Sequence, residues 1–344
     1  MTLLRRAARW RPLAALAAAL SISAAGAADA PVDLRFSFWV PAAHPLVVAT
    51  KAWAEDIAKQ SNGALTVSIY PSEQLGKAFD HYDMARDGIV DLAYVNPGYQ
   101  PGRFPLIAIG EIPFTFNDAR KGTEALDKWY RAYADKEMKD THFCMAFIHD
   151  PGTLHSKRKI TDPSELKGLK VRPAQGTIGQ LVKQLGGTNV QASAPEAREV
   201  LDRGVADAIT FPWGSLYLFG IDKVVKYHID APLYTTVFTY NMNKDKYNAL
   251  SPAQRAVVDS HCTTEWAVKL AGAWGDFEAA GREKARADPS HHFYKLTPEE
   301  MAAWKDAVKP LLVKWADAAK KAGFDPDDAR SKLQADIAEA GAAP

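Results

Sequence analysis

The sequence has only two cysteines in 344 residues, Cys144 and Cys262, and neither lies in a Cys-x-x-Cys pair. A Cys-x-x-Cys redox or metal motif is therefore excluded. Two cysteines allow one disulfide or two buried free thiols. Spacing along the chain cannot show whether their Cα atoms lie within bonding distance, so both alternatives stay open.

Signatures of the common enzyme classes are also missing. The chain has no Gly-x-Ser-x-Gly elbow, no Walker loop, no Gly-x-Gly-x-x-Gly after a predicted strand and no His-Glu-x-x-His. The adjacent histidines His291 and His292 lie in a polar segment that we expect at the surface, because a metal site needs more convergent ligands. We therefore expect no enzymatic activity, no metal and no cofactor. A periplasmic hydrolase is the alternative, and turnover assays would distinguish it from a binding protein.

The chain also lacks an excess of charge of either sign. Lys and Arg number 42 and Asp and Glu 41, for a net charge of +1, and the body of the chain has no basic run. This balance gives no reason to expect nucleic acid as a partner. With 47% apolar and 24% charged residues, the chain is typical of a globular protein long enough for two domains.

The first residues differ from the rest. Four arginines up to Arg11 precede an apolar stretch from Leu13 to Gly26, and small residues follow to Ala30. This pattern predicts a secretory signal peptide over residues 1–28 and a periplasmic location. An uncleaved membrane anchor is disfavoured because the apolar stretch is too short to span a bilayer. Arg5-Arg6 leaves twin-arginine export as an alternative to general secretion.

The remaining chain alternates strand-like and helix-like segments, which predicts an α/β fold. Predicted strands cover Leu34–Val40, Leu65–Tyr70, Asp91–Val95, Leu169–Arg172, Asp207–Phe211 and Tyr234–Met242. Predicted helices cover His44–Gln60, Ala78–Asp87, Thr177–Leu185, Pro195–Arg203, Pro252–Ala287 and the region after Thr297. Thr297-Pro298-Glu299-Glu300 is a typical helix start, with Thr as N-cap and Glu at the third position.

A short pattern occurs in both halves of the chain. Arg86–Asp91 and Asp202–Asp207 each read as a helix end, a glycine and a short strand, and a Pro-containing turn with glycine follows both. Glycine caps before strands are common, so chance is the alternative explanation. Two such units suit a protein of two similar lobes. Ligands in α/β sheets bind beyond the carboxyl ends of strands, so two facing ends would form a cleft.

Several residues near these strand ends are candidates for ligand binding. Arg172 ends a predicted strand, and its planar guanidinium suits a carboxylate, although an exposed strand-end arginine is the alternative. Aromatic residues gather at the same ends, where they could line a cleft or pack in the core. The candidate set is Arg172, Trp39, His44, Tyr94, Asn96, Tyr99, Phe211, Trp213 and Tyr217.

Four motifs, in this order and spacing, resemble one family. They are Trp53–Ile57 continuing to Gly76, Asp162–Arg172, Pro195–Pro212, and Asn243–Tyr247 before a long helix. The chain resembles the substrate-binding proteins of tripartite ATP-independent periplasmic (TRAP) transporters over residues 33–325. The resemblance implies a two-lobed clamshell with crossing hinge strands and a long helix that spans both lobes.

The resemblance also implies a role for Arg172 and a set of partners. The matching arginine of the family binds the ligand carboxylate, and the closed form engages a two-subunit membrane permease. The expected lobes are residues 31–150 plus 237–275 for lobe I, and 151–236 plus 276–344 for lobe II. We expect a monomer that delivers its ligand to the permease. A ligand sensor that docks a receptor is the alternative.

Departures from the family pattern concern the ligand. Ala208-Ile209-Thr210-Phe211 replaces a common Gly-Gln-Glu-Asn, Ala194 stands where an aromatic residue is frequent, and Asp150-Pro151-Gly152 lacks a second basic residue seen in binders of acidic sugars. These changes remove polar partners. They favour a monocarboxylate with an apolar or aromatic body over a hydroxylated sugar acid, with a C4-dicarboxylate or other small polar acid as the alternative.

Overall fold

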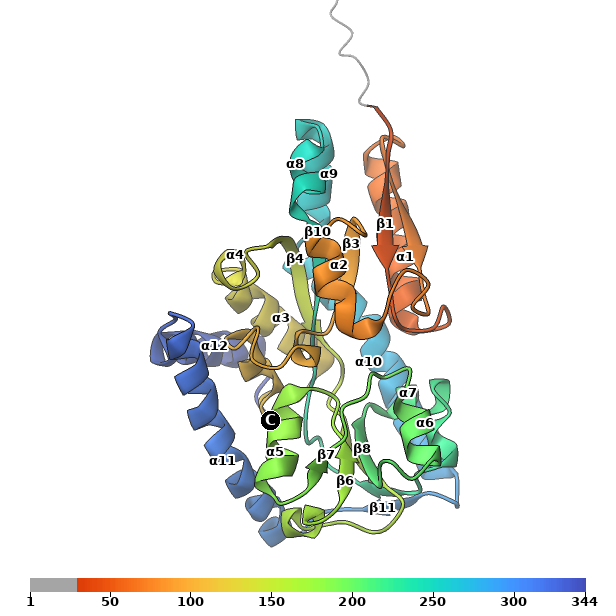
Figure 1. The fold of residues 1–344 in the computed structure, drawn as a ribbon, viewed down its shortest axis with the longest axis vertical. Coiled ribbons are helices and arrows are strands. Elements are labelled where there is room, and N and C mark those ends of the chain that lie inside the picture. The colour runs from red at the N-terminus through yellow and green to blue at the C-terminus, as the bar shows by residue number, and fades with distance from the viewer. Residues whose placement is uncertain (1–29) are drawn as a thin grey trace, which may run out of the picture.

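The computed structural model describes residues 30–344, so the predicted signal peptide lies outside the described residues. The chain forms two mixed sheets, each covered by helices, in two lobes (Figure 1). The predicted α/β class and two-lobed architecture are confirmed.

The sheet of lobe I has the strand order β2-β1-β3-β10-β4. Its strands are β1 (Val32–Ser37), β2 (Leu65–Tyr70), β3 (Leu92–Val95), β4 (Thr141–Ile148) and β10 (Val237–Asn243). The lobe also holds α1 (Pro45–Gln60), α2 (His81–Arg86), α3 (Ala119–Tyr130), α4 (Ala134–Glu137), α8 (Lys244–Ala249) and α9 (Pro252–His261). Because β1 and β3 are parallel neighbours, their carboxyl ends meet at one edge of the sheet.

The sheet of lobe II has the strand order β11-β9-β5-β8-β6-β7. Its strands are β5 (Thr153–Ser156), β6 (Lys170–Arg172), β7 (Thr188–Asn189), β8 (Ala208–Phe211), β9 (Tyr227–Ile229) and β11 (His292–Tyr294). Its helices include α5 (Gly176–Gln184), α6 (Ala197–Asp202) and α7 (Trp213–Leu218). Here β6 and β8 are parallel neighbours, so Arg172 and Phe211 both stand at the cleft edge of this sheet.

Two chain segments and one helix connect the lobes. The chain crosses from β4 to β5 and returns from β9 to β10, and an isolated bridge pairs Gly152 with Tyr234 where the two crossings meet. Helix α10 (Thr264–Ala287) runs from lobe I to α7 of lobe II (Figure 1). A Cβ at Gly281 would lie 2.1 Å from the Gly214 Cα, so the close crossing of α10 and α7 requires glycine.

The predicted elements occur at or near their expected positions, and Leu65–Tyr70 has the predicted ends. One prediction is wrong: the single helix over Pro252–Ala287 is two helices, α9 and α10, separated at Cys262 and Thr263. Thr263 caps α10 by accepting a hydrogen bond from the Trp266 amide at 3.3 Å, which starts a new helix there. Strand β4 and helix α3 were not predicted.

The last two helices cover the outside of the molecule. Helix α11 (Pro298–Lys321) begins with the predicted capping box of Thr297 and Glu300. Helix α12 (Pro326–Ala340) packs against α3 of lobe I, where the Trp129 indole donates to the Ala329 carbonyl at 2.8 Å. This differs from the predicted boundaries, which place residues 276–344 in lobe II.

The two cysteines form a disulfide with an S–S distance of 2.04 Å. The bond ties the middle of β4 to the C-terminal end of α9, so it lies within lobe I. Between residues 30 and 344, no helix is both long enough and apolar enough to cross a membrane.

Candidate functional site

A cavity lies between the lobes at the facing edges of the two sheets. Six of the predicted site residues line it: Trp39, His44, Asn96, Tyr99, Arg172 and Phe211. The rest of its wall is Val40, His149, Ala174, Ala194, Pro212, Ser215, Phe219, Tyr234, Thr236, Phe238 and Trp274. Whether these residues bind a ligand stays a prediction.

Arg172 is the one arginine or lysine in this wall, and its side chain is only 1% exposed. Its Nε donates to the Ala192 carbonyl at 3.0 Å, and its Nη2 lies 3.3 Å from the Tyr99 hydroxyl. No acidic side chain of residues 30–344 forms an ion pair with it, and Nη1 has no hydrogen-bond partner among them. A buried cation without a counter-ion is costly, so the site is chemically prepared for an anion.

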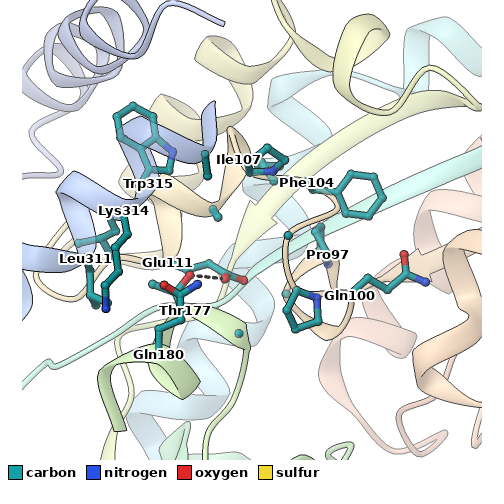
Figure 2. A pocket seen from close by; sticks show the side chains of 18 residues that line it. Pro97, Gln100, Phe104, Ile107, Glu111, Thr177, Gln180, Leu311, Lys314 and Trp315 are labelled. Carbon is teal, nitrogen blue, oxygen red and sulfur yellow. Dashed lines mark hydrogen bonds between the residues drawn. The ribbon is translucent and has the colours of Figure 1, made fainter. Parts of the chain in front are cut away.

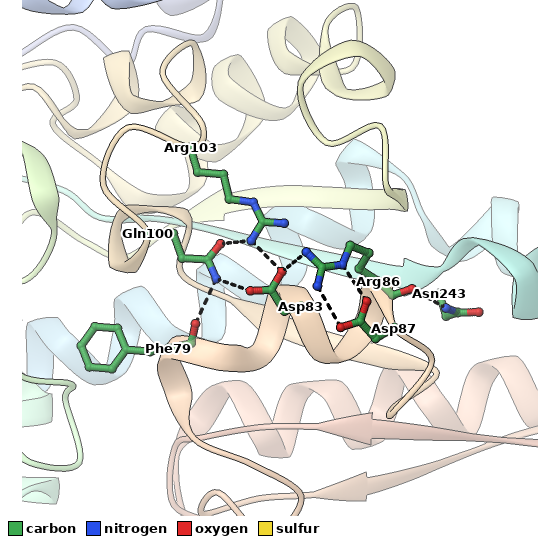
Figure 3. Close-up of polar contacts among 7 residues, drawn as sticks. All are labelled: Phe79, Asp83, Arg86, Asp87, Gln100, Arg103 and Asn243. Carbon is green, nitrogen blue, oxygen red and sulfur yellow. Dashed lines mark hydrogen bonds and ion pairs between the residues drawn. The ribbon is translucent and has the colours of Figure 1, made fainter.

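Tyr99 connects the two lobes beside Arg172. Its hydroxyl accepts from the Ala194 amide of lobe II at 2.8 Å while its ring belongs to lobe I. A polar network fixes the turn that carries it (Figure 3). Gln100 donates to the Phe79 carbonyl at 3.1 Å, and Arg103 donates to Asp83 at 2.7 Å. The contacts of Gln100 and Arg103 therefore anchor the turn to lobe I, separately from the contact that Tyr99 makes with lobe II.

The walls of the cavity are mainly aromatic. Trp39 stacks on Tyr94 with ring centroids 4.8 Å apart, Phe238 and Trp274 lie 5.1 Å apart, and Phe211 and Phe219 lie 5.5 Å apart. The Arg172 guanidinium carbon is 5.6 Å from the Phe211 ring centroid. Such walls suit an apolar or aromatic ligand body next to the charged group.

Two histidines in the wall are held neutral. Burial lowers the pKa of His44 to about 3, and burial lowers that of His149 to about 4. The His44 Nδ1 accepts from the Leu46 amide at 3.2 Å, so the neutral ring carries its proton on Nε2. The His149 Nε2 accepts from the Thr236 amide at 3.1 Å, and its Nδ1 bonds the Asp150 carbonyl. Neither ring adds positive charge to the cleft.

Three predicted site residues do not line the cavity. Tyr94 lies behind Trp39 in the core of lobe I, Trp213 stacks on Phe293 with centroids 5.2 Å apart, and Tyr217 lies under Lys284, whose Nζ is 4.0 Å from its ring. Strand β3 ends between Tyr94 and Asn96, and β8 ends before Trp213 and Tyr217 of helix α7, so the alternation of a strand does not continue from the one residue to the other. Any ligand contact by these three would need a different conformation.

Sequence reasoning missed part of the wall. Tyr234, Thr236 and Phe238 alternate along the crossing segment into β10, so all three side chains point to the cleft. Their spacing within the predicted strand Tyr234–Met242 was the available signal. Trp274 comes from α10, and nothing in the local sequence marks it.

The prediction that His291 lies at the surface is wrong, because His291 is 6% exposed. It ends a buried chain of imidazoles behind Phe211. His155 Nε2 lies 2.9 Å from the Phe211 carbonyl, His155 Nδ1 lies 2.7 Å from His228 Nδ1, and His228 Nε2 lies 2.7 Å from His291 Nδ1. Lys226 Nζ lies 3.2 Å from His291 Nε2 at the other end.

The groups at the two ends of the row of imidazoles determine which ring nitrogens carry the protons. Lys226 can only donate and the Phe211 carbonyl can only accept, so each ring carries one proton and every donor points toward Phe211. Burial lowers the pKa of all three histidines, that of His155 to about 3. Residues 30–344 hold no group of three or more His, Cys, Asp or Glu that could bind a metal.

A second cavity lies on the seam between the lobes and α11 (Figure 2). Glu111 of lobe I accepts from the Thr177 hydroxyl of α5 at 3.2 Å, while its second oxygen has no partner in the described chain. Burial raises the pKa of Glu111 to about 8. This cavity is separated from Arg172 and does not share the charged group of the cleft.

Several solved structures of similar fold contain bound aromatic acids. A TRAP solute-binding protein of Rhodoferax ferrireducens, solved with benzoate, is 29% identical with a TM-score of 0.84, over 90% of this chain and 98% of that one. A marine metagenome protein described as specific for aromatic acid ligands is 31% identical with a TM-score of 0.83, over 90% and 99%. A Bordetella bronchiseptica protein solved with mandelate is 29% identical with a TM-score of 0.84, over 90% and 99%.

The family model for bacterial extracellular solute-binding proteins of family 7 matches residues 36–318, which is most of the chain. Together with the fold, this confirms the family that the four sequence motifs predicted. Proteins of this family are substrate-binding components of transport systems that work with membrane permeases, and they are not enzymes. The chain belongs to the bacterial extracellular solute-binding proteins of family 7, the solute-binding components of TRAP transporters.

Proposed function

We propose that this protein captures an aromatic monocarboxylate in the cleft between its lobes and delivers it to a TRAP permease. The observation that carries the proposal is the buried, unpaired Arg172 in an aromatic cavity. The carboxylate supplies the missing counter-ion through a two-pronged pair with the guanidinium. The ring of the ligand packs between walls that include Trp39 and Phe211.

Charge favours a monocarboxylate over the C4-dicarboxylate alternative. Arg172 is the only arginine or lysine in the wall, and His44 and His149 are neutral. A second carboxylate would be buried without a cation, which is unfavourable. The aromatic acids bound by the proteins of similar fold support the same ligand class.

Calorimetry on the purified protein tests the proposal. Benzoate and phenylacetate should bind at least tenfold more tightly than succinate, malate or glucuronate. Tighter binding of a dicarboxylate or of the sugar acid would overturn the aromatic assignment. Binding of no carboxylate at all would overturn the role of Arg172.

Delivery to the permease, the monomeric state and export to the periplasm belong to the same proposal. We expect cleavage of the predicted signal peptide over residues 1–28, which mass spectrometry of the exported protein measures. Small-angle scattering should show a smaller radius when ligand is bound, because the lobes close by a hinge motion. Transport by cells with and without the permease genes separates delivery from the alternative of a sensor that docks a receptor.

A further inference from the structure

A buried carboxylate lies directly behind one wall of the cleft. Glu278 of α10 is 1% exposed and forms no ion pair with any residue between 30 and 344. Its Oε1 accepts from the Trp274 indole Nε1 at 2.6 Å and from the Ser215 hydroxyl at 2.5 Å. Its Oε2 accepts from the Ser215 amide at 3.1 Å and from the Gly214 amide at 2.5 Å. Each oxygen therefore accepts two hydrogen bonds, which completes the capacity of an ionised carboxylate.

Two glycines bring this carboxylate to the start of α7. A Cβ at Gly214 would lie 2.5 Å from the Phe277 carbonyl oxygen, and a Cβ at Gly281 would lie 2.1 Å from the Gly214 Cα. Both clashes are with backbone atoms, so α7 can approach α10 this closely only because neither residue has a side chain. Glu278 follows Phe277 on α10 and thereby reaches the amide groups at the start of α7.

Two of the residues that Glu278 holds line the cleft. Trp274 packs in the wall against lobe I, with its ring centroid 4.9 Å from that of His44 and 5.1 Å from that of Phe238. Ser215 belongs to the part of the wall that α7 of lobe II supplies. The Trp274 N–H and the Ser215 O–H are the only side-chain donors of these two residues, and both are directed to Glu278. A ligand in the cleft therefore meets the aromatic ring of Trp274 and finds no free side-chain donor on either residue.

The carboxylate also places negative charge behind this wall. Three of its donors, the Gly214 amide, the Ser215 amide and Trp274 Nε1, cannot accept a hydrogen bond, so the ionised form suits its surroundings. Burial raises the pKa of Glu278 to about 7 and the hydrogen bonds oppose that rise, so the carboxylate form prevails at pH 8. A second carboxylate of a ligand on this side of the cleft would meet a buried charge of its own sign and no free side-chain donor on Trp274 or Ser215.

We propose that Glu278 is a positioning residue that sets the specificity of the cleft. By taking up the donors of Trp274 and Ser215 it keeps this wall apolar, so the wall accepts an apolar ligand body and rejects a second carboxylate. The inference rests on the proposed function, in which Arg172 binds the first carboxylate. Arg172 alone does not provide this discrimination, because a guanidinium pairs with a carboxylate of either kind of acid.

The ratio of the benzoate and succinate affinities tests the inference, measured by calorimetry at pH 8 on the purified protein. Glu278→Gln nearly keeps the shape of the side chain, removes the charge and leaves one acceptor oxygen, which can accept from only two of the four donors. Succinate should gain about tenfold in affinity relative to benzoate, which corresponds to about one hydrogen bond. The exposed Glu283→Gln removes one charge from the same helix and should leave the ratio unchanged.

An unchanged ratio in Glu278→Gln, including an equal loss of affinity for both acids, would show that Glu278 only supports the fold and would overturn the inference alone. Ser215→Ala decides independently, also where Glu278→Gln does not fold. Because the Ser215 hydroxyl is committed to Glu278, this variant should bind benzoate within about threefold of the wild type. A tenfold loss would show that the hydroxyl binds the ligand, against the inference. Tighter binding of succinate than of benzoate by the wild type, or binding of neither, would overturn the proposed function and the inference with it.

Discussion

Two buried polar regions lie on either side of Phe211, and they differ in how their polar atoms are satisfied. On the cleft side, Arg172 has no counter-ion and four other side chains leave a polar atom unpartnered in the described chain. Behind Phe211, all six ring nitrogens of His155, His228 and His291 have a partner. The first region needs a molecule from outside, whereas the second is complete.

Whether the buried polar atoms of a region have partners therefore distinguishes a binding site from a structural region more reliably than the types of residue in it do. Histidine and tryptophan are both common in binding sites, yet Trp213 and the three histidines serve the packing of lobe II. Substitutions in the complete region should therefore change the free energy of unfolding. Substitutions in the unsatisfied region should change ligand affinity.

The largest effect is expected at Arg172. Arg172→Ala removes the cation and leaves the ligand carboxylate without a partner, so affinity for benzoate should fall by about 2–5 kcal/mol, the range for truncated buried charge pairs. Calorimetry measures this loss. The exposed Arg158→Ala is the control and should bind normally, while an unchanged affinity in Arg172→Ala would remove Arg172 from the site.

The next effect concerns the complete region. His228→Leu removes two hydrogen bonds and leaves nitrogen atoms of His155 and His291 unpaired, so stability should fall by about 2–4 kcal/mol. Benzoate affinity should stay within about threefold, because the binding groups are untouched. Urea unfolding measures stability, with the exposed His292→Leu as control. A large affinity loss at unchanged stability would break the distinction between the regions.

Glu111 extends the comparison of the two regions. One of its carboxyl oxygens has no hydrogen-bond partner in the described chain, although it lies outside the cleft. Its folded pKa of about 8 lies above the unfolded value of 4.5, so its contribution to stability falls as pH rises from about 4.5 to about 8. Glu111→Gln does not titrate. The stability of the variant relative to the wild type should therefore rise across this window, by at most about 1.4 kcal/mol per pH unit.

Denaturant unfolding of both proteins at several pH values between 4.5 and 8 measures this difference. Exposed Glu299→Gln is the control and should follow the wild type throughout. A constant difference between Glu111→Gln and the wild type would show that Glu111 is ionised in the folded protein, and the orphan oxygen would then need a different explanation.

The smallest effect is expected for an unsatisfied hydroxyl. Thr236→Val removes an unpartnered Oγ1 at nearly constant shape, so the ligand-free protein should be as stable as the wild type or more stable by up to about 1 kcal/mol. Thr153→Val is the matched control, because the Thr153 hydroxyl donates to the Ile229 carbonyl at 2.7 Å. This control should lose about 1–2 kcal/mol. Equal losses in both variants would show that the Thr236 hydroxyl is satisfied.

Local sequence determined the secondary structure and the family. The strand Leu65–Tyr70 alternates and ends at Pro71, and Thr297 with Glu300 forms the predicted capping box, because both depend on neighbouring residues alone. The strand-end position of Arg172 also followed from its neighbours. These features need no contact between distant segments.

Tertiary structure decided which candidate side chains share the cleft. Asn96 and Tyr94 are two residues apart, yet the chain turns after β3, so Asn96 lines the cavity and Tyr94 packs beneath Trp39. The burial of His291 depends on β9 and β5, and the disulfide depends on α9 reaching β4. Trp274 enters the wall from a helix more than two hundred residues beyond Trp39. Pairings between distant segments carry no local signal, because the packing of the sheets and α10 creates them only in the folded chain.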